Sequence, residues 1–197
     1  MKNIPSANQL TGRAIGATFF AFFGALWVLL ALYDKQHLKA ATVSWVLMDM
    51  LVLLSTAFWV FRQARRFPKM PEDSARGRVF TIINAVQWIA ISIVAFSFAR
   101  LHIDAYLLSA ITAIVGLHFF PLARLFRYGL HYVTGSVLVA WAAAGIALFP
   151  VEQLQGDTAL GTGIILWVSA FVTLLIAATA ARRALAGPGA QSASTAS

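Results

Sequence analysis

Six apolar runs, each long enough to cross a lipid bilayer, constrain this sequence more than any other feature. A hydrocarbon core of about 30 Å is spanned by about 20 helical residues at a rise of about 1.5 Å each. Because lipid offers the backbone no hydrogen-bond partner, runs of this length predict helices. We therefore expect an all-α integral membrane protein, a single bundle of six transmembrane helices over residues 12–33, 43–61, 79–98, 106–123, 133–149 and 160–180.

The composition agrees with a chain whose solvent is lipid. Of the 197 residues, 60% are hydrophobic and 11% are charged, whereas about a quarter of the residues in an ordinary soluble domain are charged. The first apolar run is longer than the core of a signal peptide, which has about 7 to 15 residues, so we expect it to remain as the first span. Residues 1–186 then form one transmembrane domain. The small and polar residues 187–197 predict a disordered tail.

The positions of the basic residues predict the orientation in the membrane. Lys and Arg near the ends of spans are retained in the cytoplasm. If the N-terminus is inside, all fifteen Lys and Arg except Lys35, Lys39 and Arg100 fall on the inner side. Glu152 and Asp157 lie in an outer loop that carries no base. This asymmetry predicts that both termini are cytoplasmic (N-in, C-in), and we expect the plasma (inner) membrane of a bacterium as the location.

The net charge of +8 does not indicate nucleic-acid binding, because the basic residues occur in short tracts between apolar runs. The cytoplasmic leaflet is often anionic, and the longest inner loop, residues 62–78, concentrates positive charge. We interpret this loop as a candidate docking surface for anionic lipid or for a partner protein. Its basic residues are Arg62, Arg65, Arg66, Lys69, Arg76 and Arg78.

Ionisable side chains inside a span are costly to insert, so each is a candidate functional residue. Only Asp49 and His118 lie well within a predicted span. Counted from the inner arginine of each helix, Asp49 and Ser92 lie about 20 Å deep. His118 and Asn84 lie about 9 Å deep, and Gln87 about 13 Å deep. The sequence thus predicts two polar layers, which outline a path for a small solute, an ion or a proton.

The same residues have a structural interpretation, which the sequence leaves open. Asp49 then pairs with a hydroxyl group or with a base such as Arg100. His118 then hydrogen-bonds to Asn84 and joins two helices, a contact worth about 0.6 kcal/mol in a membrane.

Two further features bear on helix shape and packing. Pro121 takes the helical donor from the Leu117 carbonyl, so it should kink or end the fourth helix near that residue. Such a kink exposes backbone to a substrate in some transporters, and it is also common in membrane helices without that role. Gly12 and Gly16 form a G-x-x-x-G pair, which allows close packing within the chain or in a homo-oligomer.

Several chemistries are excluded or not indicated. The chain has no cysteine, which excludes disulfides, thiolate nucleophiles and Cys-ligated metals. It has no H-E-x-x-H zinc motif, no G-x-S-x-G elbow and no Walker loop. A bis-histidine haem site is not indicated, because His37, His102 and His131 lie at the ends of predicted spans. We expect no metal and no cofactor.

The leading hypothesis is a small transporter or channel that passes a small solute, ion or proton along the polar path. The alternative is a non-catalytic membrane accessory or sensor protein, which docks lipid or a partner through residues 62–78. An intramembrane enzyme comes third, because Asp49 and His118 lie at different depths and make a poor acid–base pair. The expected partners are the bilayer and that solute, with a homo-oligomer left open.

Overall fold

The computed structural model describes residues 6–69 and 74–185, which form six long helices and one short 3₁₀ helix with no strand in these ranges. The predicted tail, residues 187–197, lies outside the described residues. All six long helices are long and apolar enough to cross a membrane. The elements are α1 (Ala7–Asp34), α2 (Ala40–Ala64), α3 (Ser74–Leu101), η1 (Asp104–Tyr106), α4 (Leu107–Phe126), α5 (Leu130–Leu148) and α6 (Val151–Leu185).

Each predicted span falls within an observed helix to within one residue, so the all-helical prediction is confirmed. The helices extend beyond the apolar runs because polar residues cap and flank them. In α1, a capping box joins Ser6 and Gln9, with 3.3 Å from the Gln9 backbone nitrogen to the Ser6 hydroxyl. Residues 151–159, expected in a loop, form the first turns of α6, which begins directly after Pro150.

The fourth helix continues past Leu117, so of the two predicted effects of Pro121 the helix end is not observed. Pro121 lies inside α4, which continues to Phe126 and stops where Arg127 takes a left-handed conformation with φ of 49°. Proline removes one helical hydrogen bond, and neighbouring helices commonly hold a membrane helix together across that gap. Here Leu122 and Ala123, which follow the proline, are buried against the rest of the bundle.

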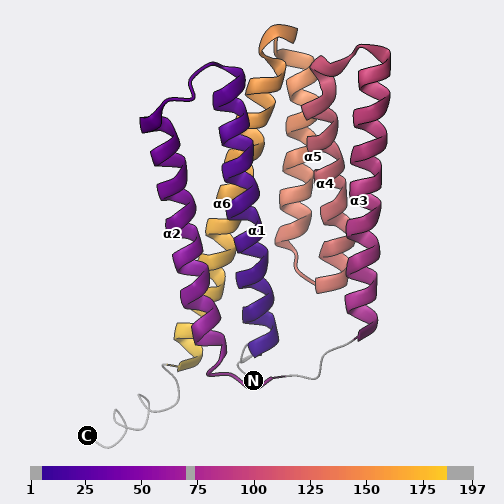
Figure 1. Cartoon of the computed structure of the whole chain (residues 1–197). Coiled ribbons are helices and arrows are strands. Elements are labelled where there is room, and N and C mark those ends of the chain that lie inside the picture. Colours follow the sequence, from indigo (N-terminus) through magenta and orange to yellow (C-terminus); the bar gives the residue numbers. More distant parts are fainter. Residues whose placement is uncertain (1–5, 70–73, 186–197) are drawn as a thin grey trace, which may run out of the picture.

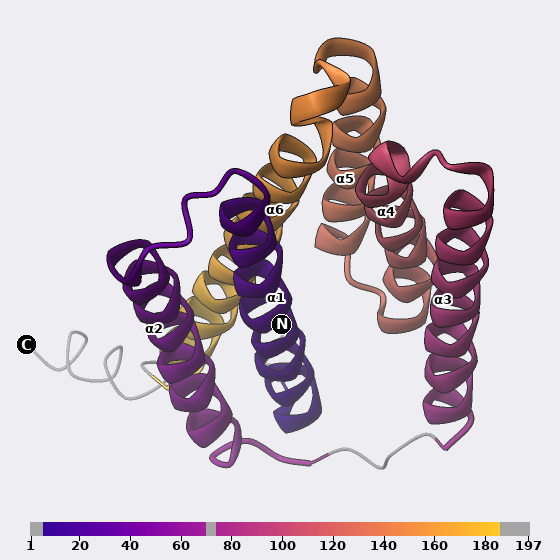
Figure 2. The ribbon, with the colours of Figure 1, turned by 45° about the horizontal axis from the view of Figure 1, so that its top comes forward.

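Helix α6 is central, and the other helices are arranged around it. It packs against α1, α2, α4 and α5, and its contact with α1 is the most extensive in the molecule. Figure 1 shows that α2 and α3 lie on opposite flanks, and the turned view in Figure 2 agrees. Helix α3 contacts η1 and α4 and has no buried residue. The start of α1 and the end of α6 lie at the same end of the bundle (Figure 1).

Two pairs of glycines allow the closest helix contacts. A Cβ atom added to Gly135 on α5 would stand 2.6 Å from the Gly116 carbonyl oxygen on α4. A Cβ atom added to Gly163 on α6 would stand 2.8 Å from the Gly24 carbonyl oxygen on α1. Small residues at such crossings let membrane helices approach closely. The G-x-x-x-G pair at 12 and 16 is not such a contact, because an added Cβ meets nothing within 4 Å at either position.

Candidate functional site

A groove between α3 and α4 brings together three of the residues that the sequence singled out. Its volume is about 340 Å³. Gln87 comes from α3, and His118 and Pro121 come from α4. The remaining lining side chains are apolar, and they are Ile82, Ile83, Val86, Ala90, Ile114 and Leu117.

The polar groups of the α3–α4 groove come from both helices. His118 is half-buried, and its ring forms a hydrogen bond with the backbone of Ile83 on α3. Gln87 has no hydrogen-bond partner for its amide within residues 6–69 and 74–185. Pro121 has no N–H to give to the Leu117 carbonyl, and both residues line the groove. An imidazole and a free amide therefore meet in one apolar groove.

Asn84 and Ser92 lie on the same helix but outside the groove. The Asn84 amide nitrogen donates to the Phe80 carbonyl oxygen one turn earlier on α3, at 2.8 Å. This bond lies within a single helix, so the expected bond from His118 to Asn84 is replaced by the bond to Ile83. Ser92 is exposed on α3. Of the three residues predicted to form the inner polar layer, His118 and Gln87 therefore line the groove together, and Asn84 does not.

Asp49 is exposed on α2, and no ion pair or hydrogen bond engages its carboxylate within the described residues. Helices α2 and α3 lie on opposite flanks, so the structure does not bring Asp49 and Ser92 together (Figures 1 and 2). Arg100 instead places its guanidinium over the Phe96 ring, 4.8 Å from the centroid. Within the described residues, Lys35 and Asp157 form an ion pair, with 2.7 Å between the Lys35 Nζ and Asp157 Oδ1 atoms. The sequence did not predict this basic partner for Asp157.

The end of the bundle where α1 begins and α6 ends is strongly basic. All described Lys and Arg except Lys35, Lys39 and Arg100 belong to the helix ends and turns on this side, and the described residues there include no Asp or Glu. Several guanidinium groups lie over aromatic rings at 5.2 to 5.9 Å, a favourable cation–π distance. The predicted docking residues Arg62, Arg65, Arg66, Lys69, Arg76 and Arg78 are all exposed at this end.

A histidine that the sequence analysis set aside lies close to His118. The rings of His118 and His131 contact the same Phe119 ring, with centroid distances of 5.8 and 5.6 Å. His131 also meets the Tyr128 ring edge-on at 5.1 Å. The Nδ1 atom of His131 and the hydroxyl of Tyr128 are buried and have no hydrogen-bond partner among the described residues. Only the turn between α4 and α5 brings these residues together, so their spacing in the sequence gave no signal.

Three hydroxyl pairs tie α6 to α4 and α5 inside the bundle, and the sequence analysis missed them. Leu138 and Leu166 are fully buried on the helices that carry the innermost pair, and Leu166 separates two of the α6 hydroxyls. The pairs are contacts between helices, and the Thr162 hydroxyl also donates to the Thr158 carbonyl oxygen at 2.7 Å. They are Ser109 with Thr158 at 3.1 Å, Thr112 with Thr162 at 2.9 Å, and Thr134 with Ser169 at 2.9 Å.

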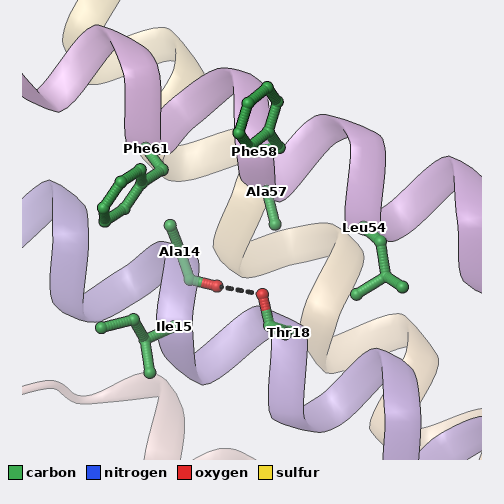
Figure 3. A pocket seen from close by; sticks show the side chains of 7 residues that line it. All are labelled: Ala14, Ile15, Thr18, Leu54, Ala57, Phe58 and Phe61. Atoms are coloured by element: carbon green, nitrogen blue, oxygen red, sulfur yellow. Dashed lines mark hydrogen bonds between the residues drawn. The ribbon is translucent and has the colours of Figure 1, made fainter.

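Among the described residues, a second groove, between α1 and α2, has no unpaired polar side chain that could bind a ligand. Its volume is about 240 Å³. Figure 3 shows its one polar side chain, Thr18, whose hydroxyl donates to the Ala14 carbonyl oxygen at 3.0 Å. The other lining side chains are apolar. Because its polar group is already paired within α1, this groove lacks the free polar groups of the α3–α4 groove.

No protein-family model matches this chain, and neither curated proteins nor solved structures show a significant match to it. The described residues also contain no cluster of three or more His, Cys, Asp or Glu side chains placed to hold a metal ion.

Proposed function

We propose that this chain is an integral membrane protein of six spans that binds a small solute in the α3–α4 groove, as a small transporter or channel does. Both termini are cytoplasmic in this proposal, and the plasma membrane of a bacterium is the location. One observation carries the proposal: Gln87, His118 and Pro121 come from two helices and line one groove of about 340 Å³. That volume lies in the range of about 300 to 1,000 Å³ that is usual for small-molecule sites.

The surroundings of the groove favour a particular kind of solute. Ile82, Val86 and Leu117 line it and remain exposed on the face that lipid covers in this orientation. A molecule can therefore enter sideways from the bilayer and bury its apolar part between the helices. The His118 ring and the Gln87 amide then supply hydrogen bonds to a single polar group. We infer a solute that is mostly apolar, with one hydroxyl group, which can donate to the free nitrogen of the His118 ring and accept from the Gln87 amide.

A groove-filling substitution with a matched control tests this proposal. Ala90→Phe places a ring in the groove, whereas Ala85→Phe places the same ring on an exposed part of α3 that does not line it. The probe is an alkyl chain with a photoreactive diazirine and a terminal hydroxyl, added to the protein in liposomes. We expect saturable labelling of α3 and α4 peptides in the parent and in Ala85→Phe, and its loss in Ala90→Phe. Labelling that never saturates, or that both variants reduce equally, contradicts the proposal.

Passage of protons is measured in the same liposomes with an entrapped pH-sensitive dye. If protons follow the inner polar layer, His118→Gln lowers the flux and Ala85→Phe leaves it at the parent level. Equal flux in the parent and in His118→Gln removes His118 from any proton path. The groove then acts in binding the apolar solute alone.

A second candidate function is favoured by the charge asymmetry of the bundle. The basic end carries Arg62, Arg65 and Arg66 close together at the end of α2, all exposed. Basic clusters next to a membrane attract anionic lipid headgroups. In this alternative the protein is a non-catalytic accessory that holds anionic lipid, and the α3–α4 groove contributes nothing.

A further inference from the structure

The carboxylate of Asp49 lies on the outer surface of the bundle, where it needs a complementary group to pair with. Asp49 lies nine residues after the start of α2, about 13 Å from the outer end of that helix. It is exposed, and nothing within residues 6–69 and 74–185 pairs with it. A carboxylate that faces hydrocarbon is costly, and such residues are normally paired with a complementary group. The chain itself does not supply that group to its own Asp49.

The opposite flank of the same chain carries the complementary groups. Ser92 lies nine residues before the end of α3, so it is as far from the outer end of its helix as Asp49 is from the outer end of α2. Ser92, Phe96 and Arg100 follow at intervals of four residues and are all exposed, so they form one row on the outer face of α3.

The row ends in the cation of Arg100, whose side chain extends toward the membrane centre. The Arg100 guanidinium lies over the Phe96 ring, at 4.8 Å, one turn deeper than its own helix position. Residues 74–101 contain no Asp or Glu. The outer face of α3 therefore offers a hydroxyl and a guanidinium, and the nearest carboxylate along the chain is that of Asp104 on η1, four residues after Arg100.

We propose that copies of this chain associate side by side in the membrane, with α2 of one copy against α3 of the next, so that the hydroxyl and guanidinium of that α3 bind the Asp49 carboxylate. The contact joins two different flanks, which lie on opposite sides of the chain in Figures 1 and 2. Repetition of such a head-to-tail contact generates a ring when the rotation closes. The proposal rests on the membrane-spanning part of the proposed function, and it is independent of the groove.

The absence of cysteine makes the contact measurable by disulfide cross-linking, because every reactive thiol is then an introduced one. Val52 on α2 and Ile89 on α3 are each twelve residues from the outer end of their helix, one turn from Asp49 and Ser92 respectively, and both are exposed. A chain with Val52→Cys is co-expressed with a chain carrying Ile89→Cys, and the membranes are oxidised. The control pairs Ile89→Cys with Ile164→Cys, an exposed position of similar depth on α6.

We expect a disulfide-linked dimer from the first pair and at least tenfold less from the control pair. Adding Asp49→Leu to the Val52→Cys chain should reduce the cross-link several-fold, while the single variant Asp49→Leu keeps the helix content of the parent, measured by circular dichroism, because the side chain is exposed within its own chain. No cross-link, equal cross-linking in both pairs, or cross-linking unaffected by Asp49→Leu overturns the proposal and leaves Asp49 to lipid or to another protein. Release of the chain from membranes by alkaline extraction is a separate result, which contradicts the membrane assignment itself.

Discussion

The close contact between α4 and α5 at Gly116 and Gly135 is tested by Gly135→Ala. The added methyl would stand 2.6 Å from the Gly116 carbonyl oxygen and 3.1 Å from the Phe119 Cβ atom. The first atom belongs to backbone and cannot rotate away, so α4 and α5 must separate. His118 lies two residues after Gly116, and the same shift therefore moves it.

The magnitude follows from a comparison with Gly16→Ala, whose added methyl meets nothing within 4 Å. Both substitutions gain the preference of alanine over glycine in a helix, about 0.8 to 1.0 kcal/mol. Gly135→Ala alone pays for overpacking, about 1 to 3 kcal/mol. The difference between the two variants is therefore about 1 to 3 kcal/mol in favour of Gly16→Ala, or a shift of about 2 to 12 °C for a chain of this size.

Thermal unfolding of the two variants in the same detergent, followed by circular dichroism, measures this difference. We expect Gly16→Ala to melt at or above the parent temperature and Gly135→Ala to melt below it. If Gly135→Ala melts as high as Gly16→Ala, α4 and α5 do not approach as closely as described.

Three further outcomes follow from the structure. Thr112→Val leaves the hydroxyl of Thr162 without its interhelical partner and should cost about 0.6 kcal/mol, and a double-mutant cycle with Thr162→Val in thermal unfolding should return a coupling of that size. Asp157→Asn breaks the pair with Lys35 and should cost at most about 1 kcal/mol, less in high salt, because both side chains are partly exposed. Replacing the exposed bases Arg65, Arg66 and Lys69 by Gln should weaken the preference of the protein for anionic over neutral lipid. The expected loss in binding free energy, measured by lipid titration, is about 1 kcal/mol per charge.

The sequence predicts the six helices well because span length depends on one quantity, the thickness of the hydrocarbon core. It does not predict which face of a helix points inward. In water an apolar face marks the core, but in lipid both the interior and the exterior of a bundle are apolar. Asp49 shows the consequence: its position along α2 follows from counting residues, yet only the structure shows that it faces outward.

The buried hydroxyls show what a closer sequence analysis would have found. Thr158, Thr162, Ser169 and Thr173 on α6 are separated by four, seven and four residues, which places them on one face of a helix. That stripe is readable from the sequence, and it marks the side of α6 that is buried in the structure. The contact of His131 with Phe119 had no such signal, because it depends on how tightly the turn after α4 folds back.

The arrangement of six spans with the basic end in the cytoplasm is tested most directly by the accessibility of single introduced cysteines. Gly129→Cys lies in the turn before α5, and Gln153→Cys lies in the first turns of α6; both positions are exposed and leave every charge in place. A membrane-impermeant maleimide is applied to intact cells, with permeabilised cells as the control. We expect that Gln153→Cys is labelled in intact cells and that Gly129→Cys is labelled only after permeabilisation. Labelling of Gly129→Cys in intact cells would contradict this arrangement.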